Sequence, residues 1–535
     1  MDIMYLRKVS RRNTDNSTVS YLQIAENIWD KQKRRSHVRV LCTLGRADER
    51  AADRIRQLVA SIRRQAPESG AGLEEGWKFE NSWDHGAFYV VGRLWESLGI
   101  RRIVEAAAKK EERSTPLERA VFAMVANRCL APRSKLGCYK RWMSDDVYFP
   151  EGGSIDLHHL YRAMDFLWEH KSEIEEALYW HLADLLSMDV DLIFYDTTSI
   201  HFEIEREDER LRRRGYSKNG RGDAPQVVIG MAVTRDGYPV KSWVFAGNRA
   251  DVTTIEEVKG DLRGWRLNRC IFVSDAGMVS EENLATLRRG GGRYIVAMPC
   301  RRGTEVVREV LSRPGRYEKV RENLEVKEVR VSDRRYVVCY NPSEAERQMK
   351  HREEVMKELK EELRGLKNHP KRACQLLSSR RYGPYLRCLK SGELRVSQTA
   401  IREREKRDGL WVIHTNDEEL SAEDLALAYK QLVRVEEAWK TMKSTIEVRP
   451  VFHRTEDRIK AHVFLCVLAL LVERVAEKAC ESTWPRLRED LRTIKIAQLL
   501  TPKGTIYQTS SGSTEARNIL KTLKIEPLPE VLRVE

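Results

Sequence analysis

Short apolar runs bounded by turn residues dominate residues 189–299 of this 535-residue chain. The first run covers residues 190–195 and ends at Asp196, and the others cover residues 227–233, 240–245, 270–274 and 294–298. Their lengths and their Gly, Pro, Asn and Asp flanks are typical of buried strands. Residues 254–262 and the segment that begins near residue 280 instead repeat apolar positions every three to four residues. This spacing predicts one helix on each side of the fourth strand.

The order of these predicted elements is more informative than any one of them. Three strands in a meander, a helix, a fourth strand, a helix and a fifth strand describe the RNase-H-like, or retroviral-integrase-like, fold. Residues 410–415 predict a further strand, and residues 423–442 and 458–478 predict two long helices. We therefore expect an α/β core formed by residues 189–299 and 409–480.

The segments outside this core differ from it in pattern. Residues 1–50 predict a small β unit with a basic turn, which either contacts DNA or caps the next domain. Its two strands are predicted at residues 19–25 and 37–45. Residues 51–188 predict a mainly helical domain, a candidate for DNA binding. Residues 300–408 predict a mixed α+β insertion, and residues 481–535 predict a polar, loosely packed C-terminal tail.

The charge of the chain narrows the class of its partners. It carries 95 Lys and Arg residues against 81 Asp and Glu residues, a net charge of +14 with a pI near 9.2. Such a surface attracts polyanions, and nucleic acid is the commonest large polyanion. A basic enzyme without a nucleic-acid partner is the alternative.

Cysteine usage and hydropathy indicate where the protein works. The ten cysteines occur singly, without zinc-ligand spacing, which is typical of free thiols in a reducing cytosol. The most apolar segment, residues 463–471, has about half of the roughly 20 residues that a membrane span needs. We therefore expect a cytoplasmic protein without a membrane partner.

Two aspartates stand at matching places in the predicted core. Asp196 and Asp275 each follow a hydrophobic strand, and functional groups converge at strand ends in α/β sheets. Neighbouring carboxylates repel each other unless a divalent metal relieves the repulsion, and oxygen ligands suit Mg²⁺ or Mn²⁺. The alternative is that each Asp caps the helix or turn that follows it. The occurrence of both in this order of elements favours the metal site.

A third carboxylate comes from the helix predicted at residues 423–442. Glu436 stands there seven residues after Tyr429 and seven before Lys443. With these spacings the chain resembles the transposases of bacterial insertion sequences that have an Asp-Asp-Glu (DDE) triad, in the group marked by a Tyr-Arg-Glu-Lys signature. Leu432 stands where the signature has Arg. The resemblance extends to Phe194-Tyr-Asp-Thr-Thr-Ser, Gly215-Tyr-Ser-Lys-Asn, Gly247-Asn-Arg-Ala-Asp, Ser274-Asp-Ala-Gly-Met, Val435-Glu-Glu-Ala-Trp-Lys-Thr-Met-Lys-Ser and Arg449-Pro-Val-Phe-His.

The resemblance implies a role for each site residue. Asp196, Asp275 and Glu436 are its catalytic and metal-binding residues, and two Mg²⁺ or Mn²⁺ ions act in an in-line displacement at phosphorus. The residues expected to contact DNA are Tyr429, Lys443, Lys218, Arg221 and Arg449. Leu432 puts one phosphate contact in doubt, and the basic loop at residues 206–221 is either a DNA clamp or a flexible connection.

The activity implied by the resemblance is DNA transposition. The protein would bind the terminal inverted repeats of an insertion sequence, cleave double-stranded DNA and join the 3′-hydroxyl ends to target DNA. A dimer would pair the two ends in a synaptic complex, in the cytoplasm at the nucleoid. Two alternatives stay open: a metal-dependent nuclease of the same fold that cuts without joining, and a decayed transposase that only binds element ends.

Overall fold

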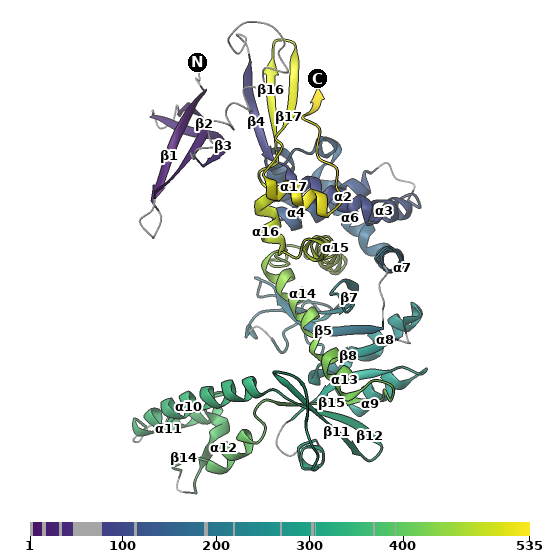
Figure 1. Cartoon of the computed structure of the whole chain (residues 1–535), viewed down its shortest axis with the longest axis vertical. Helices are drawn as coiled ribbons and strands as arrows, with labels where there is room; N and C mark the ends of the chain where they lie inside the picture. Colours follow the sequence, from purple (N-terminus) through teal and green to yellow (C-terminus); the bar gives the residue numbers. More distant parts are fainter. Residues whose placement is uncertain are drawn as a thin grey trace. The chain divides into compact units, whose positions relative to one another are not determined.

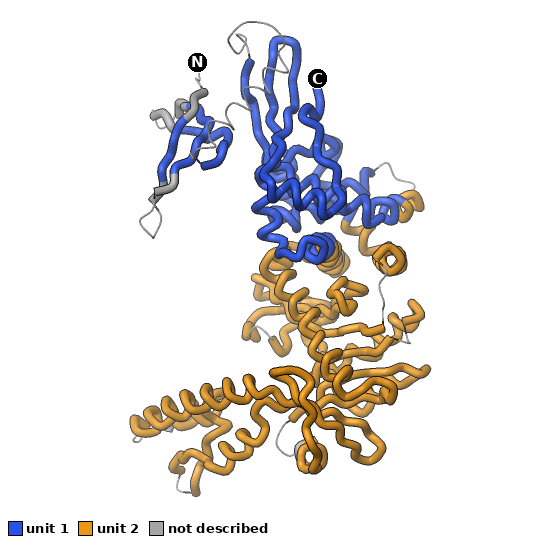
Figure 2. The backbone as a smooth tube through the Cα atoms, viewed as in Figure 1, with its two compact units in different colours: residues 1–105, 112–163, 472–535 blue, residues 106–111, 164–471 orange. Residues whose placement is uncertain are grey.

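The computed structural model covers two compact units of the chain. The residues that it describes are 4–12, 18–30, 35–46, 77–111, 115–186, 191–217, 220–267, 270–300, 304, 306–366, 370–390 and 392–535. Unit 1 contains residues 1–105, 112–163 and 472–535, and unit 2 contains residues 106–111 and 164–471 (Figure 2). Each unit is described by itself.

A nine-stranded mixed sheet forms the centre of unit 2 (Figure 1), in the order β10-β11-β12-β15-β9-β8-β5-β6-β7. Its strands are β5 (Leu192–His201), β6 (Gln226–Val233), β7 (Pro239–Ala246), β8 (Ile271–Ser274), β9 (Tyr294–Met298), β10 (Glu318–Arg321), β11 (Leu324–Val331), β12 (Arg334–Tyr340) and β15 (Leu410–Thr415). β5, β6 and β7 form an antiparallel meander, and β8 is parallel to both β5 and β9. The five strands predicted for the first part of the core are confirmed, in the predicted order.

The region predicted as an insertion adds strands to this same sheet. β10, β11 and β12 are antiparallel neighbours, and β15 pairs antiparallel with both β12 and β9. The rest of the region contains η6 (Val306–Val310), α10 (Pro342–Arg364), α11 (Pro370–Ser378), η7 (Gly383–Tyr385), the paired strands β13 (Leu386–Cys388) and β14 (Leu394–Val396), and α12 (Gln398–Glu405). The first part of the insertion therefore extends the central sheet, and the rest is mainly the helices α10, α11 and α12.

Apolar side chains fix the sheet against helices of unit 2. A buried cluster contains Tyr195 of β5 and Phe272 of β8 together with Leu262 of α8 (Ile255–Gly264) and Leu284 of α9 (Glu281–Arg288). α7 (Lys171–Leu185) adds Tyr179 to it. The hydrophobic effect on these side chains holds β5 and β8, the strands that carry the two aspartates, in a fixed position.

The helix predicted at residues 423–442 is in fact two helices, so this prediction is wrong. α13 (Ala422–Lys430) ends before Gln431, and α14 (Val433–Ser444) begins after Leu432. The amides of Leu432 and Val435 donate to carbonyls three residues back, at 2.9 and 3.1 Å, so the chain tightens at this point. The Leu432 side chain is only 7% exposed, and its burial holds the break.

The strand predicted to end at Asp196 is longer than expected. β5 runs to His201 and stays paired with β6 along its whole length, with His201 opposite Gln226. The β8 partner on its other side ends at Ser274, opposite Tyr195. Asp196 is therefore the first residue of β5 beyond its pairing with β8, which explains why a run of apolar residues ends there.

An antiparallel sheet of three strands begins unit 1. It consists of β1 (Met4–Arg12), β2 (Thr18–Asp30) and β3 (Arg35–Arg46). The two predicted strands lie within β2 and β3 and are confirmed, and β1 is an additional strand. Most of the predicted basic turn, residues 31–34, lies outside the described residues.

The last part of the chain is folded into unit 1, so the prediction of a loosely packed tail is wrong. α16 (Trp484–Leu491) buries Trp484 and Leu491 completely, and the Trp484 indole donates to the Cys129 carbonyl at 2.7 Å. A four-stranded sheet in the order β18 (Val531–Val534), β17 (Gly504–Thr509), β16 (Lys495–Thr501) and β4 (Lys78–Asp84) joins this region to residues far back in the chain. Most Ser, Thr and Gly residues of this region lie in the two inner strands of this sheet and in the turns next to them.

The remaining elements complete the two units. They are β4 (Lys78–Asp84), α2 (Gly86–Ser97), α3 (Ile100–Ala108), α4 (Leu117–Leu130), α5 (Lys135–Gly137), η1 (Cys138–Asp146), η2 (Pro150–Ser154), α6 (Leu157–Glu169), η3 (Asp251–Thr253), η5 (Ala276–Met278), α15 (Glu456–Cys480), β16 (Lys495–Thr501), β17 (Gly504–Thr509), α17 (Thr514–Thr522) and β18 (Val531–Val534). Within the described ranges, each helix is too short or too polar to cross a membrane.

Candidate active site

The register of β5 and β8 brings the two predicted aspartates together. Tyr195 and Ser274 are Cα partners in this parallel pair, and Asp196 and Asp275 are the next residue on each strand. Adjacent strands lie about 4.8 Å apart, so Asp196 within β5 and Asp275 directly after β8 lie side by side at the same level. Asp196 is partly exposed and Asp275 is exposed.

α14 places Lys443 over the strand that carries Asp196. The helix packs on β5 and β6, and the Lys443 Nζ donates to the Thr198 Oγ1 at 2.6 Å. Thr198 lies two residues beyond Asp196, so both side chains point to the same face of β5. This hydrogen bond fixes the end of α14 beside the first aspartate.

Tyr429, at the end of α13, connects the second aspartate to the helices. Its hydroxyl donates to the Asp275 Oδ1 at 3.2 Å. Burial raises the pKa of the Tyr429 phenol, and the negative charges of Asp275 and Glu436 raise this pKa further. Tyr429 is therefore a protonated donor at neutral pH, and Glu436 is close enough to act on it electrostatically.

Glu436 lies between these two contacts along the chain. It is exposed in the first turn of α14, after the Tyr429 contact with Asp275 and before the Lys443 contact with Thr198. The contacts of Tyr429 with Asp275 and of Lys443 with Thr198, and the electrostatic effect of Glu436 on Tyr429, bring Glu436 into the same region as Asp196 and Asp275.

Leu432, which stands where the expected Tyr-Arg-Glu-Lys signature has Arg, offers no cation to a ligand. Leu432 is buried, and the nearby Arg434 is engaged by the Glu437 carboxylate at 3.1 Å. We therefore find no residue on this turn that replaces the phosphate contact of an Arg at position 432.

Two threonine hydroxyls of β5 were missed by the sequence analysis. The Thr198 hydroxyl accepts a hydrogen bond from the Lys443 ammonium group. The Thr197 hydroxyl, on the opposite face of the strand, donates to the Asp251 Oδ1 at 2.6 Å. A pocket lies beside the second half of β5. It is lined by Thr198, Ser199, Tyr216, Val228, Arg249, Ala250, Asp251, Val252 and Gly277. The alternation of side chains along a strand is the signal that could have identified both hydroxyls.

The other residues predicted to contact DNA are Arg449, Arg221 and Lys218. Arg449 lies at the far end of β5, where its Nη1 and the His201 Nδ1 are 3.1 Å apart. In the basic loop, Arg221 is paired with Asp223 at 3.0 Å, and Lys218 lies outside the described residues. Acids of the loop itself also neutralise other arginines, in the pairs Arg212–Asp208, Arg213–Glu207 and Arg214–Glu207.

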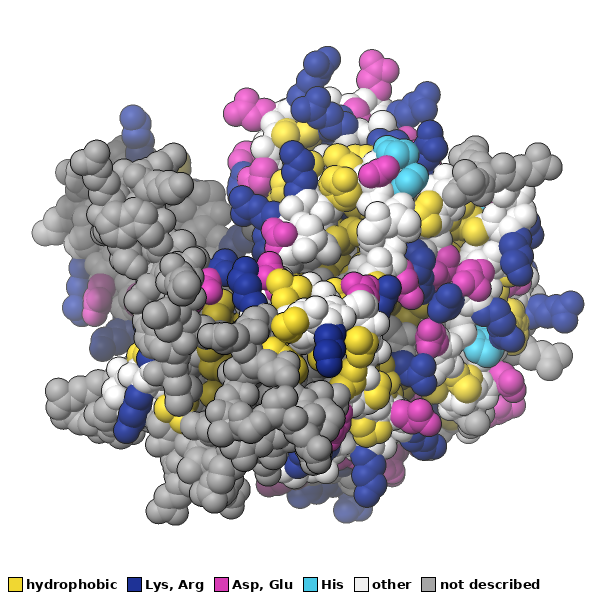
Figure 3. All heavy atoms as spheres, turned by 90° about the horizontal axis from the view of Figure 1, so that it is seen from above, with side chains coloured by type: hydrophobic (Ala, Val, Ile, Leu, Met, Phe, Trp, Pro, Cys, Tyr) yellow, Lys and Arg dark blue, Asp and Glu magenta, His cyan; other side chains and the backbone are white. Residues whose placement is uncertain are grey.

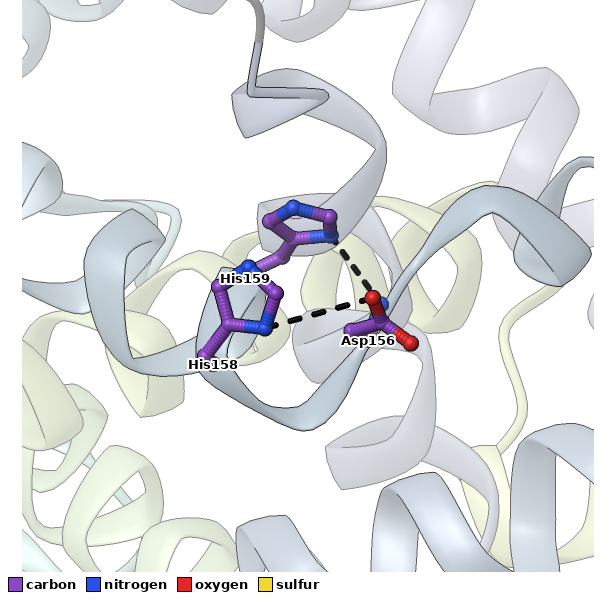
Figure 4. Close-up of side chains that lie close together, drawn as sticks. All are labelled: Asp156, His158 and His159. Carbon is purple, nitrogen blue, oxygen red and sulfur yellow. Dashed lines mark hydrogen bonds and ion pairs between the residues drawn. The ribbon is translucent and has the colours of Figure 1, made fainter.

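Two groups of side chains in the described residues hold metal-ligand atoms within 4.8 Å of one another, and Asp196, Asp275 and Glu436 do not form such a group. One is Asp156, His158 and His159 at the start of α6 (Figure 4). There the Asp156 amide donates to the His159 Nδ1 at 3.0 Å, so this nitrogen already serves as a helix cap. The other group is Glu111, Glu169 and His170. The all-oxygen set of the triad is the one whose chemistry suits Mg²⁺ or Mn²⁺.

Comparisons with known proteins bear on this geometry. Residues 191–472 match the family described as the transposase DDE domain, and residues 6–75 match the N-terminal domain of IS1634 family transposases. One similar solved structure is a cryo-EM structure of a piggyBac transposase synaptic complex with hairpin DNA. The likeness has a TM-score of 0.35 and 10% sequence identity, and covers 76% of this chain and 79% of that chain. No curated protein sequence matches the chain.

Proposed function

The chain belongs to the DDE-domain transposases, a family whose match covers more than half of its residues, and we propose that Asp196, Asp275 and Glu436 are its catalytic triad. The observation that carries this proposal is the pairing of Tyr195 with Ser274, which brings Asp196 and Asp275 side by side. The strand order β7-β6-β5-β8-β9 within the larger sheet supports an RNase-H-like core.

The triad suits a pair of divalent cations. Its three carboxylates supply only hard oxygen ligands, so Asp196, Asp275 and Glu436 would together hold two Mg²⁺ or Mn²⁺ ions. Such ions activate an attacking water or 3′-hydroxyl and stabilise the leaving oxygen of an in-line displacement. Tyr429 would hold the Asp275 carboxylate in position through its hydrogen bond.

Basic residues around the triad would position the DNA. Lys443 lies beside Asp196 on a neighbouring element, where an ammonium group neutralises a phosphate next to the cut bond. Lys218, Arg221 and Arg449 would hold the backbone further along the duplex. In this proposal the enzyme cleaves double-stranded DNA at the ends of its element and joins the 3′-hydroxyls to target DNA, as a dimer that pairs two ends at the nucleoid in the cytoplasm.

The first test replaces Asp196 with Asn, which keeps the shape and removes the charge. We expect Asp196→Asn to reduce Mg²⁺-dependent cutting of duplex element ends about a thousandfold or more, while binding of the same duplex in EDTA is retained. The matched control is Asp191→Asn at the start of the same strand, where the carboxylate pairs with Arg235 on the surface. Equal cutting by Asp196→Asn and the wild type would contradict the assignment.

A strand-transfer assay separates transposition from hydrolysis alone. Pre-cut element ends are mixed with a supercoiled plasmid and Mg²⁺, and joined products are scored on a gel. Covalent joining of the 3′ ends supports the proposal. Cutting of ends without any joining would assign the chain to metal-dependent nuclease activity, and binding without cutting would leave only an end-binding protein.

A further inference from the structure

Residues 371–407, here called the basic module, have a much stronger charge bias than the rest of the chain. They contain eleven Lys or Arg residues and three Asp or Glu residues. α10, which precedes them, has six Lys or Arg residues and seven Asp or Glu residues over residues 342–364. The module therefore carries a net charge of +8, more than half of the +14 of the whole chain.

The module is held on α10 by specific contacts. The Tyr382 hydroxyl donates to the Glu358 carboxylate of α10 at 2.9 Å. At its end, the buried Arg352 of α10 pairs with Asp408 at 2.6 Å. Figure 1 shows α11, α12 and β14 close to α10, at the lower left and apart from the central strands β11, β12 and β15. These contacts with α10 therefore fix the positions of the elements that carry the basic side chains.

Only part of the module's charge is neutralised. Three arginines pair with carboxylates: Arg372 with Glu362, Arg381 with Glu358, and Arg395 with Glu393. Seven cations are exposed, and none of them has an acidic partner within 4.0 Å among the described residues: Lys371, Arg380, Arg387, Lys390, Arg402, Arg404 and Lys406. By contrast, Figure 3 shows Lys and Arg interleaved with Asp and Glu over the face that it presents.

The hairpin of the module places like charges together. Arg387 of β13 and Arg395 of β14 are direct cross-strand partners, an arrangement that destabilises an isolated hairpin. Lys390 follows in the turn between these strands. A bound polyanion offsets this repulsion, because a phosphate neutralises Arg387, which has no acidic partner, whereas Arg395 already pairs with Glu393.

We propose that the basic module is a second DNA-binding surface, which holds the phosphate backbone of duplex DNA without reading its sequence. The inference rests on the transposase function, because such an enzyme handles element, flanking and target duplex. Duplex DNA carries about one negative charge per 1.7 Å of its axis, and the exposed cations of the module are opposite in charge to it. Exposed Arg and Lys on these elements contact phosphates rather than base edges.

The test measures binding of the full chain to duplex DNA by fluorescence anisotropy in EDTA. The variant is Arg387→Ala/Lys390→Ala/Arg402→Ala, and the matched control is Lys357→Ala/Lys360→Ala/Arg364→Ala, which removes three exposed cations of α10. Two probes are used, a duplex that carries an element end and an unrelated duplex of equal length. We expect the module variant to bind both probes about tenfold or more weakly at 0.1 M salt, with a salt slope smaller by about three.

Each other outcome overturns the proposal. Unchanged affinity shows that DNA does not contact the module, and equal losses in both variants show a general charge effect. A loss confined to the element-end probe assigns the module to sequence recognition instead. Because EDTA prevents cutting, the result is independent of the catalytic assignment, and a failure of Asp196→Asn to abolish cutting leaves it unaffected.

Discussion

Tyr429 connects the second aspartate of the site to the helix pair that carries Glu436. Its hydroxyl donates to Asp275, and burial together with the two nearby carboxylates raises the pKa of the phenol. A phenol that stays protonated orients a metal-binding carboxylate without adding charge. Of this arrangement, the sequence predicts the identity of Tyr429 through the signature spacing, but not its partner, since that contact joins residues far apart in the chain.

Replacement of Tyr429 by Phe tests this role. We expect Tyr429→Phe to raise the Mg²⁺ concentration needed for half-maximal cutting about tenfold, because outer-shell partners of metal ligands contribute 10–100-fold to affinity or activity. The readout is the Mg²⁺ dependence of the cutting rate. The control is Tyr89→Phe in unit 1, which also loses a hydroxyl hydrogen bond, to the Glu526 carbonyl at 2.8 Å. An unchanged Mg²⁺ dependence would remove Tyr429 from the site.

Among the elements, β15 joins the insertion to the core. It lies between β12 and β9, and its fully buried His414 stacks on Tyr336 of β12 at 4.8 Å and meets the edge of Tyr294 of β9 at 5.4 Å. Burial lowers the pKa of His414 to about 4, with smaller contributions from Arg288 and Arg334. The imidazole is therefore neutral in the folded protein at pH 7.

Acid should loosen this part of the sheet. The unfolded His414 titrates near its ordinary pKa of 6.5, above the folded value of about 4. Its contribution to stability is therefore complete above pH 6.5 and declines as the pH falls towards 4, by up to about 3 kcal/mol. We expect His414→Phe to flatten the loss of urea stability between pH 6.5 and 4, whereas His351→Gln, at an exposed position of α10, leaves it unchanged. Identical pH profiles for all three proteins would contradict this account.

Helices and strands were predicted correctly where the local sequence pattern determines them. They were missed where contacts with residues distant in the sequence determine them. The strands at residues 227–233 and 294–298 agree with β6 and β9 within one residue, because their apolar runs are bounded by turn residues. The break at Leu432 was missed, since a buried leucine continues a helical pattern as well as it ends a helix. The strand past Asp196 was missed because the polar Thr197 and Thr198 are buried by contacts with Asp251 and Lys443.

At the scale of the whole molecule, the chain folds into two units that are discontinuous in sequence. Residues 472–535 return to unit 1 and bury Trp484 there, which no local pattern predicts. The net charge of +14 indicated a polyanionic partner, but not where the charge is concentrated. In the basic loop at residues 206–221, four arginines pair with nearby acids, while the basic module leaves seven exposed cations without an acidic partner.

The proposed active site depends on metal binding by the three carboxylates. The most direct measurement is anomalous diffraction at the manganese edge from crystals of the full chain grown with Mn²⁺ and duplex DNA. We predict manganese peaks in contact with Asp196, Asp275 and Glu436, which disappear in the Asp196→Asn protein. Manganese bound only elsewhere, for example at Asp156, His158 and His159, would contradict the proposed active site.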